Sequence, residues 1–527
     1  MKPGRTPRRH LLLLSATAAV ALAASMLLTG RAAIPQVMAQ ERGRGLSISD
    51  HTGKPLAPSA VLRVGKDVYF LTPNDIWFVE NATDFLPPLQ QLRARPITPA
   101  KGKVNSIPLH ELSDFAYVPK RNSIAVLDKT GDVFEYALST KKWSLLMDSA
   151  QSAGEPDYVE LCAAAEYVCL LDPELNQLLR LPGANRVFSG TAPWRVRKGD
   201  VSVADGVAIA YDGAALVLHR NGRITTFGTG GKAQSKLDWK PPAHVRPSRF
   251  YACANGGPLY IVDRENNRVL ALIRSNQKLS WQQYLFGADS DLRGLIPGQN
   301  AFWILDRNKL ILRSLADVDE PDAKPNSRVL DERLAGFAMP IKNGALPRHP
   351  GVFPGSRRLY RRGIHAGLDL FHDPGCGTNV KMDTPVLAVE SGTVIRADWG
   401  YKDLPPAQYW AKIQACRSQH DCSEINENFF RGRQIEIDHG NGVITRYAHL
   451  NGIKKGLKVG ARVSRGEHIG YVGVSGTSNT LPGHPKYPHL HFEVWIDGKY
   501  LGYGLTPEET ICQFEDIFGA ICKRGGS

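Results

Sequence analysis

The sequence contains no Cys-x-x-Cys pair, and its Gly228-Thr-Gly-Gly-Lys232 segment lacks the spacing of a phosphate-binding loop. The first absence argues against a cysteine zinc site and the second against a nucleotide-binding P-loop. No nucleic-acid recognition motif accompanies the formal net charge of +14, so we expect no nucleic-acid partner. An anionic partner of another kind suits this charge better. The 43% hydrophobic and 22% charged residues indicate globular domains.

Only one long apolar run is present, at residues 11–28, and three arginines precede it. With small residues at Val37-Met-Ala39, this pattern predicts a secretory signal over residues 1–39. The run also reaches the lower edge of membrane-spanning length, so an uncleaved anchor is the alternative, and only then is a membrane a partner. In both cases we expect an exported protein.

Cysteine is sparse, with eight in 527 residues. The close pairs Cys416/Cys422 and Cys512/Cys522 suggest local disulfides, which suits an oxidising compartment. Cys162 and Cys169 are a further candidate pair across adjacent strands, and the sequence alone does not fix the connectivity.

Residues 60–320 repeat a pattern of apolar strand, acidic turn and second apolar strand. The turn acids are spaced by 53, 44, 40, 51 and 43 residues, and they are Asp75, Asp128, Asp172, Asp212, Asp263 and Asp306. A period in the forties predicts an all-β chain with a six-bladed β-propeller-like domain at residues 55–316. Two irregular β-domains are the alternative. We expect the aspartates to bind turn backbone groups, and the propeller to bind a protein or glycan ligand.

An acidic, proline-bearing linker is predicted at residues 317–334, and a second β-sheet-rich domain at residues 335–527. Within the second domain, residues 488–496 alternate apolar and polar side chains, which predicts a strand. His489 and His491 lie on the same face of this strand, and only one of them need touch a metal ion.

Two further motifs carry metal-binding or proton-transferring side chains. His365 and Asp369 are separated by Gly367, which allows a close backbone approach. His449 ends the second strand of a predicted hairpin whose turn is Gly440-Asn-Gly442. Two nitrogens and one carboxylate would leave a tetrahedral zinc ion one position open, as in hydrolases.

These motifs, in this order, resemble the LytM/lysostaphin-type zinc metallopeptidases over about residues 335–510. The resemblance implies one zinc ion per chain, held by His365, Asp369 and His491, with His449 and His489 as catalytic histidines. It also implies hydrolysis of peptide bonds in bacterial peptidoglycan, and hence a periplasmic or cell-envelope location. A catalytically silent wall-binding regulator and a secreted protease for glycine-rich proteins are the alternatives.

Residues 399–431 depart from the compact core of that family and are expected to form an insertion along the groove. The arginines of the cluster at residues 357–362 are expected either to be solvated or to hold substrate carboxylates. A structural role is expected for the remaining histidines of this region, which are His372, His439, His468 and His484.

Overall fold

The computed structural model describes residues 45–82, 91–99, 102–149, 158–163, 167–181, 194–195, 201–228, 233–253, 256–275, 278–419, 422 and 424–519. The predicted signal at residues 1–39 therefore lies outside the described residues. Among those that are described, no helix is both long and apolar enough to cross a bilayer.

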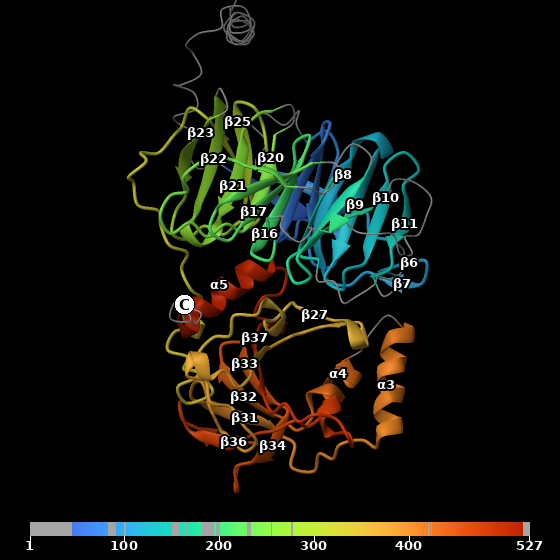
Figure 1. Cartoon of the computed structure of the whole chain (residues 1–527), viewed down its shortest axis with the longest axis vertical. Helices are drawn as coiled ribbons and strands as arrows, with labels where there is room; N and C mark the ends of the chain where they lie inside the picture. The colour runs from blue at the N-terminus through green and yellow to red at the C-terminus, as the bar shows by residue number, and fades with distance from the viewer. Residues whose placement is uncertain are drawn as a thin grey trace, which may run out of the picture. The chain divides into compact units, whose positions relative to one another are not determined.

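Up to residue 314 the described chain forms successive antiparallel arrays of strands (Figure 1). The first and last arrays are joined through β1 (Leu46–Asp50) into one eight-stranded sheet, and the arrays between them are separate four-stranded sheets. In chain order their strands are β2 (Ala60–Val64), β3 (Asp67–Leu71), β4 (Ile76–Val79) and β5 (Gln91–Pro96); β8 (Leu112–Val118), β9 (Ser123–Asp128), β10 (Val133–Ala137) and β11 (Lys142–Met147); β12 (Glu160–Ala163), β13 (Val168–Asp172), β14 (Gln177–Leu181) and β15 (Trp194–Arg195); β16 (Gly206–Tyr211), β17 (Ala215–His219), β18 (Ile224–Phe227) and β19 (Ala233–Lys236); β20 (Arg249–Ala252), β21 (Leu259–Asp263), β22 (Arg268–Ser275) and β23 (Lys278–Leu285). A last array contains β24 (Leu292–Ile296), β25 (Ala301–Asp306) and β26 (Lys309–Ser314). The short pair β6 (Lys103–Val104) and β7 (Ile107–Pro108) lies outside these arrays.

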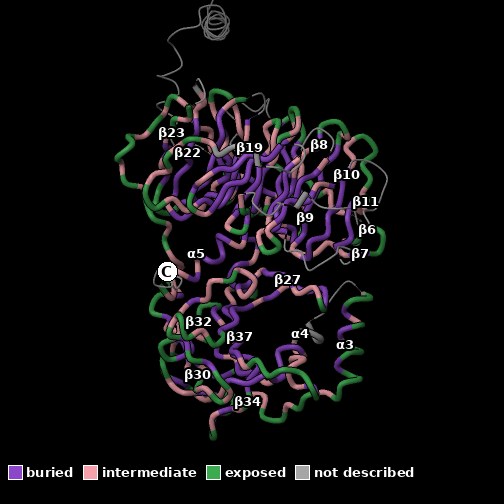
Figure 2. The backbone as a smooth tube through the Cα atoms, in the orientation of Figure 1, coloured by how far each residue is buried: buried purple, intermediate pink, exposed green. Residues whose placement is uncertain are grey.

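The first strands of the arrays contact one another in series, and β24 contacts β2, so the series closes into a ring. Strand β1 (Leu46–Asp50) pairs with β26 and so completes the last array with a segment from the other end of this part of the chain. The sheets are buried along most of their strands, while the connecting loops are more exposed (Figure 2). This arrangement confirms the predicted propeller-like, strand-rich fold.

Turn aspartates of the repeat bind backbone groups, as expected. Asp128 accepts hydrogen bonds from the backbone N–H groups of Thr130 and Asp132, and Asp172 accepts one from Leu175. Both aspartates are fully buried. Their carboxylates therefore stabilise the tight turns between strands.

After residue 356 a second set of sheets forms (Figure 1). Its main sheet has the order β29 (Leu368–Leu370), β37 (Leu490–Ile496), β33 (Val443–Ala448), β32 (Ile435–Gly440), β31 (Gly392–Ala397) and β35 (Arg462–Val463), and β38 (Lys499–Tyr500) pairs with β37. A smaller sheet contains β30 (Pro385–Leu387), β36 (His468–Val472) and β34 (Leu450–Ile453), and β27 (Arg357–Arg358) pairs with β28 (Gly363–Ile364). The predicted hairpin is present, since β32 and β33 pair antiparallel across the glycine turn.

The described residues of this part also form α3 (Pro406–Gln419) and α4 (Glu424–Arg431), which lie between β31 and β32, and α5 (Pro507–Phe518), which follows β38. The first two belong to the predicted insertion, and the predicted Cys416–Cys422 disulfide joins its helical segments. The side chain of Thr506 accepts a hydrogen bond from Glu509 N–H, and the Glu509 carboxylate accepts one from Thr506 N–H, so a capping box starts α5.

The two other predicted disulfides are wrong. Cys512 is a buried free thiol. It lies within helix α5, and its Sγ is 3.6 Å from Nη1 of Arg246. Cys162 and Cys169 do lie directly opposite each other on β12 and β13, but both are free thiols. Cys376 is disulfide-bonded, which the sequence did not indicate.

Residues Ser47–Ser527 form one compact unit, and contacts join the propeller-like part to the C-terminal part within it. Arg246 donates to Glu515 of α5 at 2.7 Å, and Lys129 donates to the carbonyl of Gly502 at 3.2 Å. Charged side chains from both parts thus pair directly.

Candidate active site

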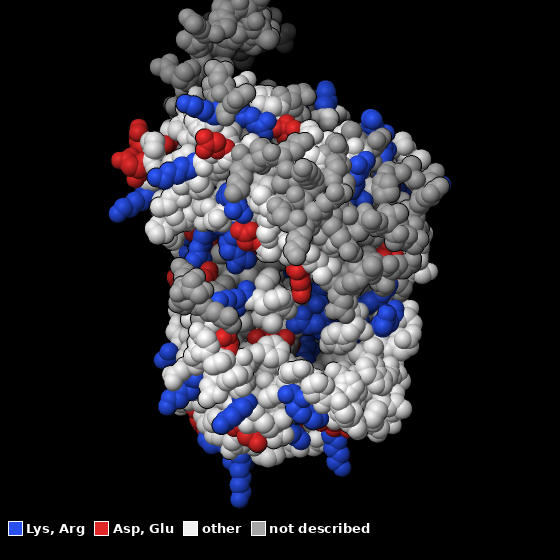
Figure 3. Space-filling model, viewed as in Figure 1, with Lys and Arg blue, Asp and Glu red and all other residues white. Residues whose placement is uncertain are grey.

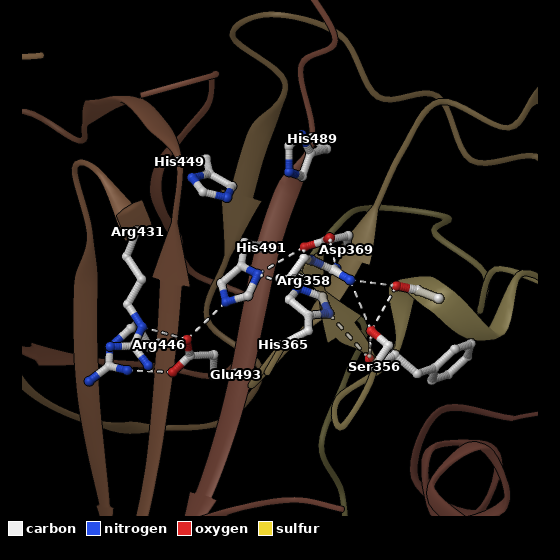
Figure 4. Close-up of polar contacts among 12 residues, drawn as sticks. Ser356, Arg358, His365, Asp369, Arg431, Arg446, His449, His489, His491 and Glu493 are labelled. Atoms are coloured by element: carbon white, nitrogen blue, oxygen red, sulfur yellow. Dashed lines mark hydrogen bonds and ion pairs between the residues drawn. The ribbon is translucent and has the colours of Figure 1, made fainter. Parts of the chain in front are cut away.

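Four segments bring the five predicted residues together (Figure 4). Asp369 lies on β29, directly opposite His491 on the neighbouring strand β37. His489 immediately precedes β37, and His449 immediately follows β33, the other neighbour of β37. The apolar residues of β37 (Leu490, Phe492 and Val494) are buried in the core, so strand alternation turns the histidines toward the opposite face.

Three donor atoms converge at the centre of the site. His365 Nε2 lies 2.9 Å from His491 Nδ1. Asp369 Oδ1 lies 3.0 Å from His365 Nε2 and 2.8 Å from His491 Nδ1. These three residues are the one potential metal-binding group found among the described residues. Ligand atoms on a tetrahedral zinc ion are separated by roughly 3.3 Å, so a small spreading of the three would admit the ion.

The second nitrogen of each ligand histidine is held by an acceptor. His365 Nδ1 donates to the carbonyl of Phe353 at 3.2 Å, and His491 Nε2 donates to the Glu493 carboxylate at 2.8 Å. A neutral imidazole carries one N–H, so these bonds leave an unprotonated nitrogen facing the other donors. Zinc-binding histidines generally have such partners, and the donor set therefore fits zinc.

Asp369 is oriented by an arginine of the basic cluster. Arg358 donates to Asp369 Oδ2 at 3.0 Å, which leaves Oδ1 turned toward the two imidazoles. Burial would raise the pKa of Asp369, but the adjacent His365 and His491 outweigh it and hold this pKa well below its usual range. Burial and Arg358 together lower the pKa of His365 to about 3. The Asp369 carboxylate is therefore ionised and the His365 imidazole is neutral, which are the forms that bind a cation.

Gly367 is required by the close packing behind the ligands. A Cβ at this position would lie 2.7 Å from the carbonyl oxygen of Phe492 and 2.8 Å from Cε1 of His491. No side chain fits between these atoms, which explains why glycine separates His365 from Asp369.

His449 and His489 stand beside the donor group with their rings 4.8 Å apart. His449 Nδ1 donates to the carbonyl of Ser475 at 2.9 Å, and His489 Nδ1 donates to that of Tyr487 at 3.0 Å. Burial, reinforced by neighbouring imidazoles, holds the pKa of His449 well below its usual range, and burial also lowers that of His489. Each neutral ring therefore has an unprotonated Nε2 that can accept a proton.

A groove of about 530 Å³ contains all five residues. One side of it is lined by the insertion, through Tyr409, Trp410 and Phe430, and the Trp410 side chain is 48% exposed. The insertion therefore lines the groove, as the sequence suggested. Phe371 stacks on His489 at a ring distance of 4.3 Å and lines the groove as well.

The arginine cluster is not a solvated loop. Arg357, Arg361 and Arg362 are each less than 10% exposed, and Arg362 pairs with Asp148 at 2.5 Å. Elsewhere on the face seen in Figure 3, Lys and Arg side chains are interspersed with Asp and Glu. Of the remaining histidines, His439 bonds Ser391 and Thr445, and His468 bonds the carbonyl of Gly470, which agrees with structural roles. Both lie on strands, His439 on β32 and His468 on β36.

Sequence reasoning missed Glu493 and Arg431 as parts of the site. Glu493 lies on the same face of β37 as His491, so the alternating pattern of this strand could have predicted that Glu493 is near the site. Arg431 ends helix α4 of the insertion, and no sequence pattern connects it to the histidine strand.

Strands, donor set and groove together are those of a metallopeptidase domain. Residues 365–502 match the model of Peptidase family M23, and this part of the chain is an M23, LytM-type, domain. The chain is 40% identical over 70 residues to the peptidoglycan DD-endopeptidase ShyA of Vibrio cholerae, a match that covers 13% of this chain and 14% of ShyA. It is 30% identical over 136 residues to lysostaphin of Staphylococcus staphylolyticus, covering 26% of this chain and 19% of lysostaphin.

The chain thus spans less than a fifth of the length of either relative. Among solved structures, the β-propeller domain of Cps50 (Swd1) from Myceliophteria thermophila aligns with a TM-score of 0.36 and 9% identity, covering 54% of this chain and 90% of that one.

Proposed function

We propose that this protein is an exported zinc metalloendopeptidase that hydrolyses peptide bonds in the stem or crosslink of bacterial peptidoglycan. The observation that carries the proposal is the convergence of His365, Asp369 and His491 beside two neutral histidines in one groove. The names of the M23 relatives, a peptidoglycan DD-endopeptidase and lysostaphin, support the substrate class. The propeller-like part is assigned to targeting or regulation.

His365 Nε2, Asp369 Oδ1 and His491 Nδ1 are the atoms that would hold the zinc ion. When bound, such an ion polarises the scissile carbonyl and acidifies water. Arg358 keeps the Asp369 carboxylate oriented, and Glu493 does the same for the His491 ring.

His449 and His489 are assigned the proton transfers. Because their Nδ1 atoms are bound to backbone carbonyls, their Nε2 atoms are available to accept a proton from the attacking water. The ring that has taken this proton at Nε2 can donate it to the developing oxyanion and then pass it to the leaving amine. In this proposal His449 and His489 transfer protons and do not bind the zinc ion.

The proposal is tested by digesting purified peptidoglycan sacculi with the protein, with and without a chelator, and reading the products by mass spectrometry. We expect loss of crosslinked dimers or of stem peptides, and we expect the chelator to stop it. The identity of the products names the bond. Intact sacculi after treatment with zinc-loaded protein would contradict the proposal and favour a wall-binding regulator.

A further inference from the structure

We infer that Arg431 is a positioning residue of the metal site. It holds the ring of His491 through Glu493 and the backbone of His449 through its own carbonyl. The inference rests on the proposed zinc site, but not on which peptide bond is cut.

The first connection runs through a shared carboxylate oxygen. Arg431 Nε donates to Glu493 Oε1 at 2.7 Å, and His491 Nε2 donates to the same oxygen at 2.8 Å (Figure 4). The Glu493 side chain is fully buried, and that of Arg431 is 8% exposed. A displacement of the Glu493 carboxylate therefore moves the hydrogen-bond acceptor that orients His491.

A buried carboxylate needs countercharge to remain ionised. Ion pairs with Arg431 and Arg446 supply this countercharge to the buried Glu493 carboxylate. The other oxygen, Oε2, accepts from Arg446 and from Trp495 Nε1. Arg431 is the one of these donors that shares Oε1 with the metal ligand.

The second connection is through the main chain. The backbone N–H of His449 donates to the carbonyl of Arg431 at 2.8 Å. His449 has a φ of 60°, in the left-handed region that residues with side chains rarely adopt. Such a conformation persists only when neighbouring groups hold it, and the bond to the Arg431 carbonyl is one that does so.

Arg431 belongs to the groove wall as well as to the metal site. It is the last residue of α4, and its neighbour Phe430 packs with Tyr409, Ile413 and the Cys416–Cys422 disulfide in a small apolar cluster. Phe430, Tyr409 and Arg431 also line the groove. A change in the insertion is therefore transmitted through one residue to a metal ligand and to a catalytic histidine.

The experiment compares Arg431→Met and Arg431→Lys with wild type in the full chain. Arg396→Met is the matched control, because Arg396 also pairs with the insertion, through Asn428, but contacts no residue of the donor group. Zinc affinity is measured with zinc alone, by competition with a chromophoric chelator, and kcat and KM are measured on crosslinked muropeptides.

For Arg431→Met we expect zinc affinity to fall at least about tenfold, as is typical when a partner of a metal ligand is lost. We also expect kcat to fall while KM stays within about twofold, because methionine keeps most of the volume of this groove-lining side chain and the bond that is lost is the one to Glu493. Arg431→Lys should recover part of both losses by restoring the charge, and the control should match wild type in zinc affinity and kcat.

Wild-type zinc affinity and kcat in Arg431→Met would overturn the inference and leave the proposed function standing. If Arg431→Met does not fold, the comparison of Arg431→Lys with wild type decides, and unchanged zinc affinity in that variant overturns it equally. A wild-type protein that binds no zinc and cuts no muropeptide would instead refute the proposed function itself.

Discussion

Replacing Gly367 by alanine tests the packing behind the zinc ligands with a single methyl group. The new Cβ would lie 2.8 Å from Cε1 of His491, whereas ordinary contact begins at 3.4 Å, so the ring or the backbone must move by about 0.6 Å. Metal–ligand distances tolerate only about 0.2 Å. The opposing carbonyl of Phe492, at 2.7 Å, belongs to a central strand and cannot yield without disturbing the sheet.

We therefore expect Gly367→Ala to lower the free energy of unfolding by about 1–3 kcal/mol, the usual cost of overpacking. Zinc affinity should fall by more than tenfold, measured by competition with a chelator, and turnover of muropeptides should fall with it. Gly400→Ala is the control, since a Cβ there meets nothing within 4 Å. Zinc binding by Gly367→Ala at wild-type affinity would refute the argument that His491 is fixed by this contact.

Three further predictions concern the histidines and the insertion. His489→Ala should abolish turnover but retain zinc, whereas His491→Ala should lose both turnover and zinc. Metal analysis that finds zinc in His491→Ala but not in His489→Ala would contradict this assignment. Because the pKa of His449 is held well below its usual value, kcat/KM should decline only as the pH falls below 6.5, and an acid limb at or above 6.5 would contradict a buried neutral base. Cys416→Ser opens a loop closed by residues six apart, which should lower the free energy of unfolding by about 2 kcal/mol, and an unchanged value in chemical denaturation would contradict this.

The convergence of the five candidate residues was largely predictable because they lie in motifs whose geometry is local. Alternation placed the histidines of β37 on one face, and the glycine turn fixed the hairpin that ends at His449. What the sequence did not contain is the partner of each side chain across the fold. Arg431 and Glu493 are 62 residues apart, and only the fold brings their side chains together.

The cysteine predictions were also limited, because the sequence does not show which side chains meet across the fold. The six-residue spacing of Cys416 and Cys422 did correspond to a disulfide. Cys512, by contrast, lies within helix α5, where its side chain contacts Arg246 of the propeller-like part. Spacing along the chain therefore predicts a pairing only where the intervening residues turn back.

The left-handed backbone of His449 offers a practical route to the natural substrate. Asparagine is among the few residues that tolerate this conformation, so His449→Asn would remove the imidazole while leaving the main-chain bond to Arg431 in place. We expect such a variant to fold, to bind zinc and to keep its groove, but to bind a substrate without hydrolysing it, because one of the two proposed proton-transferring histidines is missing. Under the proposed function, this variant would retain an uncut molecule from a mixture of muropeptides, and the retained molecule would identify the crosslink that is preferred.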